Sequence, residues 1–276
     1  MSEQATVTET SEDIERRRRQ KYTARVYLLT TFFLIVSFVQ WTLIKFFLDV
    51  SVFLKEHFFI PLLLILIALI LITVFVFFEN LRFSIPVNWI IVVIIIELVT
   101  FGLTSAIVHI SFPRFGSSIL IVIIMFMIFT AIGIYMKVGS CSEISSSWRD
   151  ITYDIAILFA CTILFFIATI IFMSMAVLAG MNFSVLFYGI CIECTAVMFM
   201  LYHTQTIHGG RYAEMRYKDA LMATLLLYND FIILYIITLF ILKAVLDKKT
   251  SIYAFKDMLS DDTPENSTEN TGNSTA

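Results

Sequence analysis

The chain has 276 residues, of which 59% are hydrophobic and 15% are charged, and its mean hydropathy is +0.89. A soluble domain carries about 45–50% apolar and about 25% charged residues, so this composition excludes a water-soluble globular protein. The net charge of −3 says little as a total, but acidic residues at the start of the chain are followed at once by a run of arginines at 16–19.

Long apolar blocks, not periodic stripes, carry the hydrophobicity. A helix needs about 20 apolar residues to cross a hydrocarbon core of about 30 Å. Blocks of this length occur at residues 26–48, 58–78, 87–109, 117–136, 151–173, 183–202 and 220–242. No small-residue cleavage site follows the first block, so we interpret it as a retained helix and not as a signal peptide. The sequence therefore predicts an all-α integral membrane protein with a seven-transmembrane-helix bundle.

Polar segments flank these blocks. We expect a polar and basic tail at residues 1–25, a membrane domain at 26–242 and a disordered polar tail at 243–276, because such tails lack the apolar residues that offset the entropy of ordering. The last segment contains glycosylation sequons at Asn266 and Asn273. They would be usable only on the lumenal or extracellular side of a membrane.

Lys and Arg near the ends of spans indicate orientation, because cytoplasmic loops carry an excess of both. With the N-terminus in the cytoplasm, the inner segments hold twelve of the nineteen basic residues and the outer segments hold seven. The lysines of the C-terminal tail oppose this choice, whereas the first helix favours it. We therefore expect a cytoplasmic N-terminus.

Ionisable residues inside the apolar blocks are few, and each requires a reason, because a charge in hydrocarbon costs several kcal/mol. Asp230 lies about ten residues into the seventh block, near the middle of the membrane, and His203 lies at the cytoplasmic end of the sixth. Glu97 and Glu193 are the other deep acids. Together they suggest a polar pathway. The alternatives are a structural carboxyl at Asp230, an interfacial histidine at 203 and helix packing for the two glutamates.

Signatures of other functions are absent from the sequence. Cys191 and Cys194 have a CxxC spacing, but they lie in an apolar span, where such cysteines behave as small hydrophobes. The chain contains no zinc-protease motif, nucleophile elbow or phosphate loop. We expect no enzymatic activity, no bound cofactor and no nucleic-acid partner, since the arginine run adjoins a membrane span and serves topology.

Four short motifs resemble the transmembrane Bax-inhibitor-motif family, which includes the Lifeguard proteins. RVYLL at residues 25–29 resembles the family's entry into its first helix, and Arg82 followed by IPVNW at 85–89 resembles the entry to the third. YHTQ at 202–205 resembles the end of the sixth helix, and LYNDF at 227–231 resembles the Leu-Tyr-x-Asp signature of the seventh. The order and spacing of these motifs cover nearly the whole membrane domain.

The resemblance implies six helices around a central seventh, a pH-sensitive calcium leak, and restraint of cell death in the endoplasmic reticulum or Golgi more than at the plasma membrane. In that family two carboxylates, near the end of helix six and in helix seven, share a proton and close the pore beside a basic residue from the second helix. Asp230 matches the helix-seven carboxylate, and would be the oxygen ligand for passing calcium, while Arg82 matches the base. His203 stands where the family usually has aspartate.

That substitution changes the expected chemistry. A histidine facing an aspartate would close the gate by a salt bridge that forms as pH falls and is lost as His203 deprotonates. Calcium should bind less well, since it prefers oxygen ligands. The alternative is a non-conducting regulator that acts through other membrane proteins of cell-death control. A seven-helix receptor fits less well, because its N-terminus would lie outside.

Overall fold

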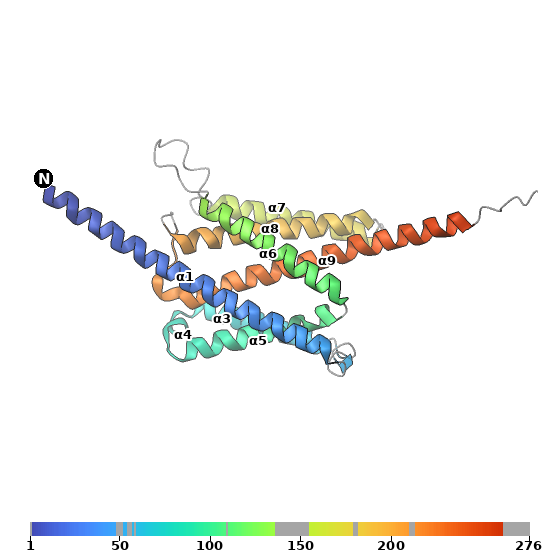
Figure 1. The fold of residues 1–276 in the computed structure, drawn as a ribbon, viewed down its shortest axis with the longest axis horizontal. Coiled ribbons are helices and arrows are strands. Elements are labelled where there is room, and N and C mark those ends of the chain that lie inside the picture. Colours follow the sequence, from blue (N-terminus) through green and yellow to red (C-terminus); the bar gives the residue numbers. More distant parts are fainter. Residues whose placement is uncertain are drawn as a thin grey trace, which may run out of the picture.

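The computed structural model describes residues 2–47, 52–53, 57, 59–108, 110–135, 155–178, 182–209 and 213–261. These residues contain helices and no strand. The order is α1 (Ser2–Phe46), α3 (Phe59–Phe77), α4 (Glu79–Phe83), α5 (Val87–Val108), α6 (Phe112–Tyr135), α7 (Ile155–Leu178), α8 (Asn182–His208), the short 3-10 helix η2 (Tyr217–Asp219) and α9 (Ala220–Asp261) (Figure 1).

Seven helices of the described chain are long and apolar enough to cross a membrane. They coincide with the seven apolar blocks, which confirms the predicted all-α membrane fold. One boundary differs in a way that matters for function: α8 continues to His208, six residues beyond the predicted end of the sixth block. The polar residues Thr204 and Gln205 ended the hydropathy signal, but both are fully buried in the bundle. Gly209, with φ of 70°, then ends the helix in the left-handed conformation that glycine adopts most easily.

Both ends of the chain are more helical than the sequence suggested. α1 begins at Ser2 and α9 continues to Asp261, so residues 243–261 are helical where we expected a disordered tail. No glycine or proline occurs between residues 220 and 261, and the lysines, leucines and alanines there are good helix formers. The two helices project from opposite ends of the bundle (Figure 1). Asn266 and Asn273 lie outside the described residues.

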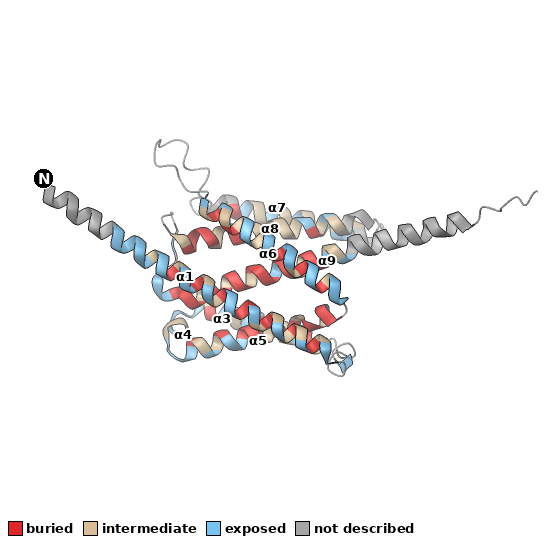
Figure 2. Ribbon diagram, viewed as in Figure 1, coloured by how far each residue is buried: buried red, intermediate tan, exposed pale blue. Residues whose placement is uncertain are grey.

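The seventh spanning helix, α9, is central, as the resemblance implied. It packs against α8, α6, α1 and α5, whereas α3 packs mainly on α5 and α7 on α8. Within the most apolar stretch of each span, 56% of the residues are buried in α9 and 6% in α7. Figure 2 shows this contrast, with buried residues along α9 and exposed or half-buried ones along α7. Asp230 therefore lies on the most deeply buried of the seven spanning helices.

Aromatic packing and one close helix contact hold α9 and α8 in place. The rings of Trp41 on α1 and Tyr235 on α9 stack with centroids 5.4 Å apart. On the other side, Gly133 brings α6 against α8, because a Cβ at this position would lie 2.9 Å from Cγ2 of Thr204. The outward surfaces are apolar, as at Leu62 and Leu66, which suits contact with lipid in a membrane-spanning bundle.

Candidate functional site

His203 and Asp230 form a buried pair between α8 and α9. Nδ1 of His203 lies 2.6 Å from Oδ2 of Asp230, and 15% and 8% of the two side chains are exposed. The sequence placed Asp230 at mid-membrane and His203 at the cytoplasmic end of its helix. Because α8 extends to His208, the structure instead places His203 inside the helix and at the depth of Asp230.

The surroundings of this pair are aromatic. The ring centroids of Phe199 and Tyr202 lie 6.4 Å and 5.7 Å from that of His203. A buried ion pair needs good geometry to offset the loss of hydration, and removal of one partner leaves the other uncompensated. An unperturbed imidazole gains or loses its proton near pH 6.5. The arrangement is therefore able to switch between an ion pair and a hydrogen bond from a neutral imidazole to the carboxylate.

Arg82 belongs to a second cluster of charges. Its Nη1 lies 3.3 Å from Oδ1 of Asp219 and donates to Sδ of Met222. Asp219 precedes Asp230 by eleven residues, which corresponds to about 16 Å along a helix. We expected Arg82 near the His203–Asp230 pair, but the structure places it at the base of α9.

This second cluster joins α4 to the segment before α9. Nε of Arg216 donates to Oδ2 of Asp219 at 3.1 Å, and its Nη1 lies 2.7 Å from Oε1 of Glu79. Hydrogen bonds to Asp219 and Glu79 raise the pKa of Arg216 above its ordinary value, so the guanidinium remains charged over the whole accessible pH range. α1 also contributes, because Arg19 pairs with Glu214. The cluster therefore fastens the base of α9 to two neighbouring elements.

The remaining deep carboxylates have separate partners. Nε2 of Gln40 donates to both carboxylate oxygens of Glu97 at 2.9 Å, between α1 and α5. Oγ1 of Thr238 donates to Oε1 of Glu193 at 3.0 Å, between α9 and α8. Glu193 lies ten residues from His203, or about 15 Å along the helix. The structure therefore does not gather the carboxylates into one site. In the described ranges no group of three or more His, Cys, Asp and Glu residues could hold a metal ion.

A hydroxyl cluster that sequence reasoning missed lies on another side of α9. Oγ of Ser37 lies 2.8 Å from Oγ1 of Thr100 and 2.9 Å from the hydroxyl of Tyr228, and Nε1 of Trp41 donates to the carbonyl of Thr100. Tyr228 and Asp230 are two residues apart, so they point about 200° apart around the helix. The cluster fixes α9 to α1 and α5, while Asp230 faces α8.

Asp219 was also missed, and the reason is instructive. It is only 5% exposed, yet it stands in a polar connector where an acid looks ordinary. A weak signal was available. Asp219 directly precedes the seventh apolar block and Arg82 precedes the third, and the predicted topology places both residues at the cytoplasmic side.

Comparison with known proteins gives no relative. No protein-family model matches this chain, and no curated protein and no solved structure is significantly similar to it. The multi-pass membrane architecture is therefore argued from the chain's own helices, and the function from the residues described above.

Proposed function

We propose that this chain is a pH-sensitive calcium-leak protein of the Bax-inhibitor or Lifeguard type that restrains cell death from an endomembrane. The short motifs of the sequence support the family assignment, and the central position of α9 fits it. The observation that carries the proposal is the 2.6 Å contact between His203 and Asp230, because it joins a titratable imidazole to a carboxylate inside the bundle.

The pair gives the gate its pH dependence. While the imidazole is protonated and the carboxylate is ionised, the two charges are opposite and their attraction holds α8 against α9. As pH rises through the titration of His203, the imidazole loses its charge and the attraction weakens. The leak therefore closes in acid and opens towards neutral pH. Calcium is the transported ion in this proposal.

Arg82 has a different part in the proposed gate. Its ion pair with Asp219 holds the base of α9 in place. When the contact between His203 and Asp230 forms or weakens, that end of the helix therefore stays fixed. Charged groups paired in this way keep a spanning helix in register. Arg82 is a positioning residue in this scheme, and it does not contact the titrating pair.

The proposal is tested by calcium flux into liposomes that contain the purified protein, at about pH 5.5 and about pH 7.5, on either side of the imidazole titration. Wild type should show more flux at the higher pH. Asp230→Asn should lose the difference between the two pH values, because the carboxylate charge is gone. The matched control is Glu193→Gln, a deep carboxylate on the same helix interface, which should keep the pH response. Identical flux and pH response in wild type and His203→Asp would contradict the proposed chemistry.

A non-conducting regulator is the second candidate. The bonds from Gln40 to Glu97 and from Thr238 to Glu193 join neighbouring helices, which is the role that polar residues have in membrane helix packing. In this candidate the polar residues only hold the bundle together, and function comes from contact with other membrane proteins of cell-death control. Absence of flux at both pH values in protein with a normal unfolding transition would favour it.

A further inference from the structure

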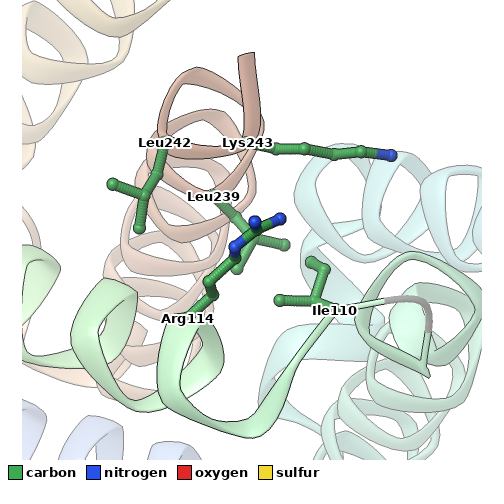
Figure 3. Close-up of a pocket in the computed structure, with 5 residues that line it drawn as sticks. All are labelled: Ile110, Arg114, Leu239, Leu242 and Lys243. Carbon is green, nitrogen blue, oxygen red and sulfur yellow. The ribbon is translucent and has the colours of Figure 1, made fainter. Parts of the chain in front are cut away.

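A pocket lies where α5 ends, α6 begins and α9 leaves the apolar part of the bundle. It is lined by Ile110, Arg114, Leu239, Leu242 and Lys243. Figure 3 shows Arg114 rising from α6 beside Leu239, while the side chain of Lys243 extends from α9 across the same end of the pocket. Two parts of the chain that are far apart in sequence thus build one site.

The lining combines two chemistries. Arg114 and Lys243 supply positive charge, and the five described lining residues include no acid. Leu239, which is 5% exposed, and its neighbours Ile110 and Leu242 supply an apolar wall. A cationic rim above an apolar wall is complementary to an anionic group attached to a hydrocarbon chain.

The depth of the pocket in the membrane indicates the same kind of ligand. Val108 ends one candidate span, the next begins at Phe112, and Lys243 ends the last. The pocket therefore lies at the border of the hydrocarbon, where lipid phosphates lie. Basic side chains at this level reach towards the interface from stems that stay in the apolar region.

A third cation beside the pocket has another task. Nζ of Lys45 donates to the carbonyls of Ile107 at 3.0 Å and Ile110 at 2.5 Å, and lies 5.4 Å from the ring centroid of Phe115. A cation at this place stabilises the negative end of α5. Lys45 therefore caps that helix, and it adds to the positive potential of the pocket.

We propose that this pocket binds the headgroup of an anionic phospholipid. The guanidinium of Arg114 is suited to hold two phosphate oxygens at once, Lys243 adds a second charge from α9, and the wall at Leu239 and Leu242 meets the first carbons of the acyl chains. Such a lipid would bridge α6 and α9. The site is independent of the proposed gate and requires only that the bundle lies in a membrane.

Native mass spectrometry of the purified full-length protein tests the site, with phosphatidylserine or phosphatidylcholine added to the detergent. Wild type should bind phosphatidylserine more tightly. The double variant Arg114→Gln/Lys243→Gln should bind it about 30-fold more weakly, as expected for two basic residues at a lipid phosphate. The control Lys248→Gln/Lys249→Gln removes the same charge just beyond the pocket's described lining and should leave the preference nearly intact.

Two further arms separate the outcomes. Lys243 is exposed, so Lys243→Gln alone tests the site without disturbing the core, and a loss of about fivefold is expected. Millimolar inorganic phosphate should not displace the lipid, because it lacks the hydrocarbon part. Undiminished phosphatidylserine binding by the folded double variant, an equal loss in the control, or displacement by phosphate would each overturn the proposal.

Discussion

His203 and Asp230 lose most of their hydration where α8 packs on α9, and the two side chains contact each other at 2.6 Å. Removal of one member of such a pair leaves an uncompensated buried group, which costs about 3–5 kcal/mol when the remaining group is charged. Replacement of both by apolar residues of similar size is often neutral. The pair is thus more important for what it switches than for net stability.

A double-mutant cycle tests this energetic reading. His203→Leu leaves the Asp230 carboxylate without its partner, so we expect a loss of about 3 kcal/mol in the free energy of unfolding. The double variant His203→Leu/Asp230→Leu should recover most of that loss. Unfolding in detergent micelles, followed by circular dichroism, measures both.

His208 on the same helix provides the matched control. Its Nδ1 lies 3.0 Å from the backbone carbonyl of Thr204, so His208→Leu removes a contact with a neutral carbonyl group and should cost less than His203→Leu. A double variant as unstable as His203→Leu alone would show that the pair is not the source of the effect.

Residues of this kind differ in how visible they are in the sequence. Asp230 stands out because a charge inside an apolar block breaks a one-dimensional pattern. Asp219 does not stand out, because polar connectors contain many acids. Only 5% of the residue is exposed, because neighbouring residues fold over it. The sequence therefore finds buried charges only where the surrounding chain is apolar.

At the level of helices, close packing depends on small residues. Gly133 and Gly116 lie on the same helix, α6, but in different surroundings. A Cβ on Gly133 would lie 3.1 Å from Cβ of Thr204, whereas a Cβ on Gly116 would meet nothing within 4 Å. Thr204 is buried and β-branched, so its side chain has little freedom to move aside.

This pair of glycines gives a controlled prediction. Gly116→Ala should raise the free energy of unfolding by up to about 1 kcal/mol, since alanine favours helix. Gly133→Ala gains the same propensity but must push α6 away from α8, at a cost of about 1–3 kcal/mol. Thermal unfolding of the two variants should therefore shift in opposite directions. Equal stabilisation of both would mean that α6 and α8 do not approach closely here.

Helix ends show the same limit of sequence reasoning. Hydropathy ended the sixth span at residue 202, because the next side chains are polar, yet α8 continues through them to His208. Thr204 and Gln205 are buried by α6 and its neighbours. A hydropathy window along the sequence does not predict this burial, because it does not include residues from other helices. The physical signal that ends the helix is Gly209, with its positive φ of 70°.

For the whole molecule, seven spans place the two ends of the chain on opposite sides of a membrane. The basic residues near the first span predict a cytoplasmic N-terminus, so the C-terminal tail with Asn266 and Asn273 should face the lumen or the exterior. We expect protease to remove an N-terminal epitope tag in cells with a permeabilised plasma membrane and to leave a C-terminal tag intact.

Glycosylation checks the same topology independently. A lumenal tail should carry glycans that shift its mobility on a gel, and Asn266→Gln/Asn273→Gln should abolish the shift, because the asparagines are the acceptors. Seven spans place the two tags on opposite sides of the membrane. Protection of both tags, or cleavage of both, would therefore contradict the seven-span arrangement. Protection of the N-terminal tag alone would reverse the orientation and leave the bundle unchanged.

Composition and hydropathy were sufficient for the membrane class, the seven spans and Asp230 as an exceptional residue. These properties are additive along windows of about 20 residues, so neighbours distant in the sequence do not alter them. Partners are different, because they depend on how each helix is rotated and how it is aligned with the next. The packing of α8 on α9 brings His203 into contact with Asp230. The approach of α4 to the base of α9 pairs Arg82 with Asp219. These contacts depend on how side chains from separate helices pack against one another. No single segment of the chain therefore determines them.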